Sequence, residues 1–122
     1  MNHLEEFTLD GKSMVYIDFS SFNSNEEFKS FIESAKPVMK KYPPNSVYAI
    51  TNLTGILFNK TTHEMMADWV EHNKPYVRYG AVFGMDAVKK TLAQTIAIIT
   101  KRKNLIYVSS KEEAIARLLK QE

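Results

Sequence analysis

The chain contains three histidines, the side chains best suited to exchange protons near neutral pH. Of these, His63 is the one we expect close to the loops that follow the predicted strands. As a general base it needs a hydroxyl nucleophile, with Ser21 and Thr54 as the candidates, and a carboxylate that orients the ring. Glu64 is adjacent in sequence, but neighbouring helix residues point in different directions. We therefore predict no catalytic residue and a protein that is not an enzyme.

Metal and nucleotide chemistry also find little support in the sequence. The histidines at positions 3, 63 and 72 are too dispersed for a metal site, and the chain has no cysteine. Gly84 is the one glycine at a strand-to-helix junction of the phosphate-binding kind. Such loops need several glycines at fixed offsets, and Asp86 would repel a phosphate at that helix start. We predict neither a metal nor a cofactor.

Composition describes an ordinary globular chain. Its 122 residues, 44% of them hydrophobic, suffice for one core, so we expect a single domain over residues 1–122. The formal net charge of +2 lacks the dense basic footprint of a nucleic-acid binder. The first residues show neither a basic nor an apolar signal region, and no apolar run is long enough to span a membrane. We expect a cytoplasmic protein, either a monomer or a weak homodimer.

Three segments are typical of helix starts, because a hydroxyl residue is followed three positions later by glutamate. They are residues 24–27, 61–64 and 110–113. Each precedes an amphipathic stretch, and a strand-like run precedes each loop that carries one. The pattern predicts a single α/β domain in which an N-terminal β-hairpin is followed by βαβαβα units. We expect a mixed, mostly parallel five-stranded sheet with about four helices.

The same patterns place the individual elements. Strands are expected over 4–9, 13–19, 46–52, 76–84 and 104–108, with Asp10 and Gly11 forming a type I′ turn between the first two. The first helix begins at Ser24 and continues through Pro37 with a kink. The second runs over 63–72 and ends at Asn73 in the left-handed conformation. A third helix follows Asp86, and a fourth follows residue 110, with positions 115, 118 and 119 facing inward.

Loops at the carboxyl ends of parallel strands gather hydroxyl and amide side chains, which could bind a ligand or cap the following helices. Capping is the interpretation we favour, because every such loop precedes a helix. The loop 52–59 is longer than a strand-to-helix connection needs. Its consecutive Ile56, Leu57 and Phe58 either plug the end of the sheet or form a surface for a partner or lipid. By contrast, Met65 and Trp69 lie at the helical spacing typical of core residues.

The chain resembles the STAS/SEC14-type superfamily of SpoIIAA-like anti-sigma-factor antagonists. The resemblance covers nearly the whole sequence and is closest to small stand-alone bacterial members of unassigned function. Three segments carry it: residues 16–18 (Tyr-Ile-Asp), 43–46 (Pro-Pro-Asn-Ser) and 73–77 (Asn-Lys-Pro-Tyr-Val), of which the last is the most specific.

This resemblance implies a fold of the same kind and a docking role. Antagonist members bind a kinase-type anti-sigma partner and are switched by phosphorylation of the first serine in an aspartate-serine-serine-glycine loop. Here Asn52 stands at the aspartate, Leu53 at the acceptor and Gly55 at the glycine, so Thr54 offers the remaining hydroxyl. Thr54 is therefore our candidate phosphorylation site. The lipid-carrying branch of the superfamily implies the second function considered below.

Our leading hypothesis is a non-enzymatic regulatory domain that docks a protein partner through the loop 52–59 and the start of the second helix. The predicted partner-binding residues are Asn52, Thr54, Ile56, Leu57, Phe58, Asn59 and Met85. The alternative is a carrier of a small molecule or lipid, with an apolar pocket between the sheet and the helices. Its predicted lining residues are Met65, Trp69, Val88, Leu92 and Ile96. All five are equally good core formers, so the sequence leaves pocket and packing as open alternatives.

Overall fold

The computed structural model describes residues 3–85 and 104–122 of the chain. Its strands are β1 (Leu4–Leu9), β2 (Lys12–Asp18), β3 (Val47–Asn52), β4 (Val77–Phe83) and β5 (Leu105–Tyr107). Its helices are α1 (Asn25–Lys40), α2 (Lys60–Asn73) and α4 (Lys111–Leu119). The helix predicted after Asp86 lies outside the described residues. None of the helices in the described ranges combines the length and the hydropathy that a membrane span needs.

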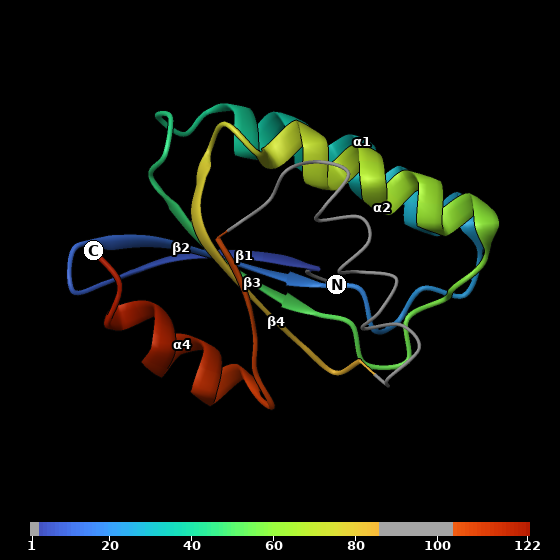
Figure 1. Ribbon diagram of the computed structural model, residues 1–122. Helices are drawn as coiled ribbons and strands as arrows, with labels where there is room; N and C mark the ends of the chain where they lie inside the picture. The colour runs from blue at the N-terminus through green and yellow to red at the C-terminus, as the bar shows by residue number, and fades with distance from the viewer. Residues whose placement is uncertain (1–2, 86–103) are drawn as a thin grey trace.

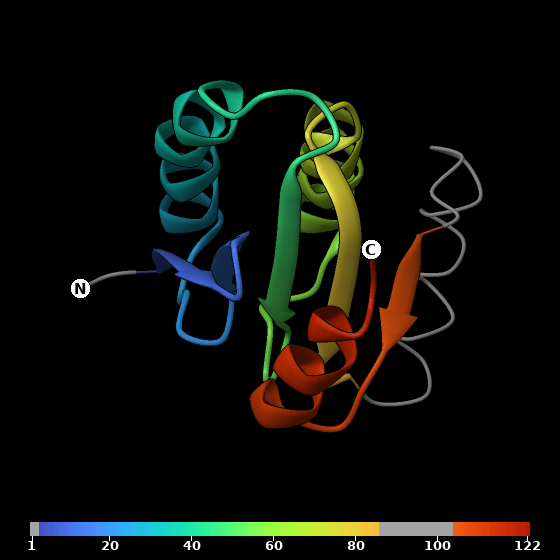
Figure 2. The same cartoon turned by 90° about the vertical axis from the view of Figure 1, so that its left-hand side faces the viewer.

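The strands form one mixed sheet whose spatial order follows the sequence. The order is β1-β2-β3-β4-β5, with β1 antiparallel to β2 and every later pair parallel. Helices α1 and α2 cover one face of this sheet, and α4 covers the other (Figure 1). Figure 2, turned by 90°, shows the same two layers of helices with the sheet between them. The predicted α/β fold is confirmed.

The alternation of side chains along the strands produces two hydrophobic clusters. On β2, Val15 and Ile17 point toward α1 and α2, whereas Met14 points toward α4. The cluster under α1 and α2 is rich in aromatic rings, with Phe19 stacked on Phe28 at a centroid distance of 5.1 Å. The first four residues of β3 are buried, as expected for a central strand with both faces covered.

The hairpin and the α1 helix follow local sequence rules closely. Asp10 and Gly11 have φ values of 50° and 77°, so both central residues of the turn are left-handed as a type I′ turn requires. Ser24 caps α1 by accepting a hydrogen bond from the Glu27 amide at 3.1 Å. The helix continues through Pro37, as predicted.

The helix α4 is capped in the same way as α1. Ser110 accepts a hydrogen bond from the Glu113 amide at 3.1 Å. The Glu113 carboxylate accepts from the amide of Ser109 at 2.8 Å, one residue before the position that the capping-box pattern predicts. The inward positions are also confirmed, because Leu118 is fully buried while Ile115 and Leu119 pack against the same cluster.

The predicted ends of the second helix are wrong at both termini. Asn59, not Thr61, is the N-cap of α2, because its side chain accepts from the Thr62 amide while Thr62 Oγ1 accepts from the Asn59 amide. The helix therefore begins at Lys60 rather than at 63. At the other end Asn73 is still helical and the cap is Lys74, with right-handed φ and ψ of −50° and −43°. An amide side chain competes with a hydroxyl for the cap position, and here the earlier residue wins.

Candidate functional site

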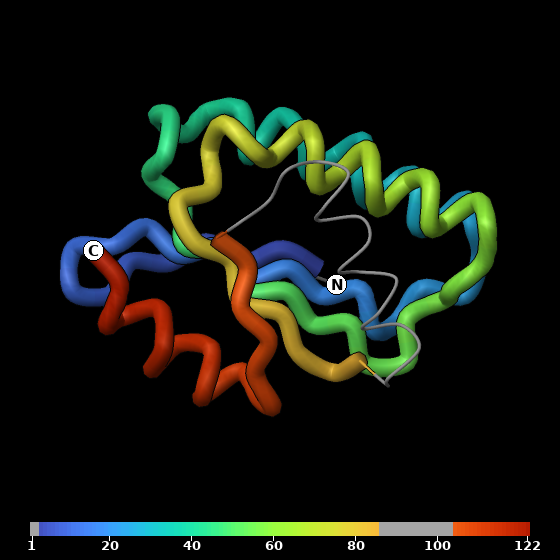
Figure 3. Tube along the Cα trace, viewed as in Figure 1, coloured from blue at the N-terminus to red at the C-terminus, as the bar shows by residue number. Residues whose placement is uncertain are grey.

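The strands β2, β3 and β4 end on the same side of the sheet, where the connecting loops converge (Figure 3). In register, Asp18 lies opposite Asn52, and Asn52 lies opposite Phe83. The loop 52–59, which we call the docking loop, starts at this edge and ends at the N-cap of α2. It is the centre of the partner-binding prediction.

Asn52 fixes the beginning of the docking loop. Its side-chain oxygen accepts from the Thr54 amide at 3.0 Å, and its side-chain nitrogen donates to the Tyr16 hydroxyl at 3.2 Å. Burial raises the pKa of Tyr16, while the hydrogen bond from Asn52 partly opposes that shift. The Lys111 ammonium lies 4.1 Å from the centroid of the Tyr16 ring, in a cation–π contact. The loop is thereby coupled to β2 and to the first residue of α4.

Apolar anchors hold the middle of the docking loop in the core. Leu53 is 6% exposed and Ile56 is 5% exposed, and both belong to the cluster under α1 and α2. Ile56 is one of the predicted partner-binding residues, but its burial leaves almost none of its side chain exposed to a partner. Its neighbours Leu57 and Phe58 are half-buried, and Phe58 packs against that cluster. For Ile56 the packing thus favours a plug at the end of the sheet over an exposed surface for a partner or lipid.

Gly84 has a packing role rather than a phosphate-binding role. Its φ is +86°, and a Cβ built on it would lie 2.6 Å from the Thr54 amide nitrogen and 2.9 Å from the Thr54 Cα. A side chain at position 84 would collide with the backbone of the docking loop. The glycine is thus required by the close approach of two loops, with its left-handed conformation as a second reason. Its neighbour Met85 packs against the core under α1 and α2.

Asn59 fixes the far end of the docking loop. Besides capping α2, its side-chain nitrogen donates to the Asn25 side-chain oxygen at 2.9 Å. Asn25 is the first residue of α1, so the starts of the two helices are joined directly. The docking loop is consequently braced at Asn52, anchored by Leu53 and Ile56, and braced again at Asn59.

The described residues do not assemble the nucleophile and base considered for His63. The His63 Nε2 atom is buried and has no hydrogen-bond partner among the described residues, and the ring lies 5.9 Å from that of Phe58. Ser21 lies instead near another histidine, with its Oγ 3.5 Å from His3 Nδ1. That nitrogen is 3.1 Å from the Asp18 carbonyl oxygen, which can only accept, so Nδ1 carries the proton and cannot act as the base.

Sequence reasoning missed the structural importance of His3. Its ring stacks on Phe22 at a centroid distance of 4.3 Å and meets Phe31 edge-on at 5.7 Å. The position of His3 could be predicted from the alternation of residues 4–9. That pattern predicts an edge strand, and the residue directly before the strand then lies beside the sheet.

Two of the five residues predicted to line a carrier pocket, Met65 and Trp69, lie in the described part of the chain. Trp69 is 3% exposed, and its ring lies 6.4 Å from that of Phe19 and 6.2 Å from that of Phe31. Met65 is half-buried and lines a shallow groove between α1 and α2. Trp69 therefore fills core space. Val88, Leu92 and Ile96 lie outside the described residues.

A depression of 480 Å³ opens beside the ends of β4 and β5. Its polar groups are largely used in capping α4. Hydrogen bonds from the Ser109 hydroxyl and amide lower the pKa of the Glu113 carboxyl, and Arg117 adds a smaller effect in the same direction. Among the described residues, no three acidic or histidine side chains lie together as metal ligands.

Comparison with known proteins identifies the fold. No protein-family model matches the sequence, and no curated protein matches it. The structure is similar to that of an anti-sigma-factor antagonist (STAS) domain protein from Planctomyces limnophilus, with a TM-score of 0.60 and 13% sequence identity. The similarity covers 95% of this chain and 97% of that chain. The chain has the STAS-like fold that the sequence resemblance implied.

Proposed function

We propose that this protein is a non-enzymatic regulatory domain that docks a protein partner through the docking loop, Met85 and the first turn of α2. The observation that carries the proposal is the contrast within the loop itself. Leu53 and Ile56 are buried anchors, whereas Thr54 and Gly55 are exposed and Leu57 is half-buried. The similarity in fold to a protein described as an anti-sigma-factor antagonist domain supports a docking role.

A braced loop is suited to protein recognition for an energetic reason. A flexible loop loses conformational entropy when a partner orders it, and that loss subtracts from the binding free energy. Here Asn52 and Asn59 fix both ends of the loop through their side-chain hydrogen bonds. Binding a partner therefore costs little conformational entropy in this loop, so a small contact surface can still give useful binding free energy.

The test is affinity capture from an extract of the source organism with the wild-type chain and a Leu57→Ser/Phe58→Asp variant. We expect the variant to lose partners that the wild type retains, because it replaces the apolar side chains of the loop. Phe58 also touches the core, so Leu57→Asp alone serves as a second variant that spares that contact. The control is Leu9→Ser, which removes an exposed leucine from the hairpin. Identical partner sets for all folded variants would contradict the docking proposal.

The same proposal assigns a regulatory role to Thr54. Thr54 is exposed on the docking loop and follows the Asn52 turn directly. Phosphorylation would add nearly two negative charges to the docking surface, with the N-terminus of α2 following at Lys60. We expect Thr54→Glu and Thr54→Val to have similar stability but different partner affinity. Equal affinity of the two variants would reduce Thr54 to a turn residue.

A further inference from the structure

The strand β1 ends the sheet and leaves alternate backbone groups free to pair. The Asp18 amide donates to the His3 carbonyl at 2.7 Å, which sets the pattern of the antiparallel ladder. Residues 3, 5, 7 and 9 bond to β2, so the amides and carbonyls of Leu4, Glu6 and Thr8 point away from it. No described strand lies beyond β1. An unpaired edge of this kind is a template for an additional strand.

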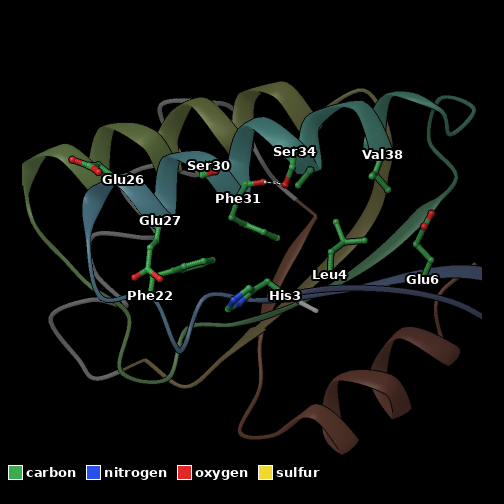
Figure 4. A pocket seen from close by; sticks show the side chains of 11 residues that line it. His3, Leu4, Glu6, Phe22, Glu26, Glu27, Ser30, Phe31, Ser34 and Val38 are labelled. Carbon is green, nitrogen blue, oxygen red and sulfur yellow. Dashed lines mark hydrogen bonds between the residues drawn. The ribbon is translucent and has the colours of Figure 1, made fainter. Parts of the chain in front are cut away.

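A groove of 760 Å³ lies directly beside this edge, between β1 and α1 (Figure 4). We call it the β1–α1 groove. It is lined by His3, Leu4, Glu6, Phe22, Glu26, Glu27, Ser30, Phe31, Ser34, Ala35 and Val38. In Figure 4 the apolar side chains of Phe31 and Leu4 lie along its middle, and Val38 lies nearer the end that holds Glu6. Glu26 and Glu27 lie toward one end and Glu6 at the other.

The charges of the β1–α1 groove favour a basic occupant. Among the residues that the structure describes, its lining contains three glutamates and no lysine or arginine. Glu6 accepts a hydrogen bond from the Tyr42 hydroxyl at 2.6 Å, and Glu27 accepts from the Asn23 amide at 2.8 Å. Each of these bonds uses one carboxylate oxygen and leaves the second available. Within the described parts of the chain, no ion pair neutralises Glu6, Glu26 or Glu27.

The size of the groove sets the length of the segment that it can hold. Glu26 and Val38 are twelve residues apart on α1, which corresponds to about 18 Å along the helix axis. An extended chain rises about 3.3 Å per residue, so roughly five residues span that length. Three alternate side chains then face the groove: the outer two meet the glutamates, and the middle one meets the apolar centre.

We propose that the free edge of β1 and the β1–α1 groove bind an extended segment of a partner protein, with a basic, an apolar and a basic side chain on its inner face. Backbone hydrogen bonds to Leu4 and Glu6 supply affinity, and the groove supplies selection among side chains. A second copy of β1 is a poorer occupant, since it would bring Leu4, Glu6 and Thr8 to the groove, none of them basic. This surface is separate from the docking loop, and its use does not depend on the function proposed above.

The probe is a fluorescent, capped peptide with the sequence lysine-threonine-valine-threonine-lysine, measured by fluorescence anisotropy against the full chain. We expect saturable binding, and binding about tenfold weaker when both lysines are replaced by glutamate, because charge complementarity reverses. Backbone amide shifts in NMR spectra should centre on Leu4 and Glu6. Shifts centred on the docking loop, or equal affinity for the two peptides, would overturn the proposal.

Backbone pairing is tested by two N-methylated forms of the peptide, one methylated at the valine and one at both threonines. Only alternate amides of an added strand face β1, so one form should lose binding and the other retain it. Loss in the valine form indicates antiparallel addition, and loss in the threonine form indicates parallel addition. Equal behaviour of the two forms would overturn strand addition.

The chain offers a matched pair of variants for the charge. Glu26 and Glu112 both lie in the acidic first turn of a serine-capped helix, but only Glu26 lines the β1–α1 groove. We expect Glu26→Lys to weaken binding of the basic peptide several-fold and Glu112→Lys to leave it unchanged. Equal effects of the two variants would contradict the placement of the peptide in the β1–α1 groove. A dimer in light scattering that the peptide does not dissociate would also contradict it.

Discussion

The docking loop and the β1–α1 groove are opposite kinds of surface on one small sheet. The docking loop has its backbone bonded at the Asn52 turn and at the Asn59 cap, with Ile56 buried beneath it. The groove has an edge strand whose alternate backbone groups point outward, and its glutamates lack basic partners within the described ranges. The docking loop has its backbone hydrogen bonds made within the chain, whereas the edge beside the β1–α1 groove has backbone groups that a partner's backbone can bond.

This difference shows how a short chain can present two surfaces from one core. Both surfaces stand on the same apolar cluster, which contains Ile56 under the loop and has Leu4 and Phe31 packed against it under the groove. Rigidity at the loop therefore depends on anchors that reach into the core, and openness at the groove depends on the end of the sheet.

The largest effect is expected at the buried anchor of the docking loop. Ile56→Ala should destabilise the fold by about 3 kcal/mol, because truncating a buried isoleucine removes apolar contacts and leaves a cavity. Leu57→Ala, at the adjacent half-buried position, should cost less than about 1 kcal/mol. Urea denaturation of both variants measures the difference. Similar losses would mean that the loop has no specific anchor.

The close approach of the two loops predicts the next effect. Gly84→Ala should destabilise by about 2 kcal/mol, since its Cβ would meet the backbone of Thr54 at 2.6 Å in a left-handed conformation. Gly55→Ala is the matched control, because Gly55 also has a positive φ of 61° but no atom of the described residues within 4 Å of the added carbon. It should cost about 1 kcal/mol, from backbone strain alone. Thermal unfolding curves separate the two, and equal costs would remove the packing role of Gly84.

The cap of α2 predicts a smaller difference. Asn59→Ala should cost about 1 kcal/mol, because it removes the acceptor for the Thr62 amide. It also removes the bond to Asn25 that joins the starts of the two helices. Thr61→Ala changes an exposed side chain that is not the cap, so its stability should stay within about 0.5 kcal/mol of the wild type. A larger cost for Thr61→Ala would restore Thr61 as the cap.

The smallest effect is expected at the groove and depends on pH. Burial, followed by the hydrogen bond to Glu6, raises the pKa of Tyr42 from 10.0 to about 12. A tyrosine whose pKa is higher when folded adds stability that is present below pH 10 and lost as the pH rises toward 12. The wild type should therefore lose more stability across that interval than Tyr42→Phe. Denaturation at the two ends of the interval measures this, and parallel losses would show that the pKa of Tyr42 is not raised in the folded protein.

Local chemistry made much of the fold predictable. The Asp10-Gly11 turn, the serine caps of α1 and α4, and the buried run of β3 are each decided by neighbouring residues. The predicted start of the second helix was wrong because Asn59 and Thr61 both satisfy the local rules for an N-cap. Asn59 also bonds to Asn25, which lies 34 positions away in the sequence, and a contact of that kind does not appear in a local pattern.

The functional surfaces were less predictable than the elements that carry them. A run of Ile56, Leu57 and Phe58 fits a plug or an exposed patch equally well, and only the packing shows that Ile56 is the plug. Gly84 looks like a phosphate-loop glycine until its approach to Thr54 is known. The β1–α1 groove could not be found by spacing, because its walls come from two elements whose separation is a tertiary quantity.

The sequence by itself determined which segments become strands and helices, and which face of each is apolar. Those properties follow from side-chain periodicity and caps, which act over a few residues. The tertiary structure alone decided which apolar residues are anchors, which glycine is indispensable and which glutamates share a groove. These depend on contacts between segments far apart in the chain, as between Gly84 and Thr54 or between Glu6 and Tyr42, where distance in space and not in sequence sets the energy.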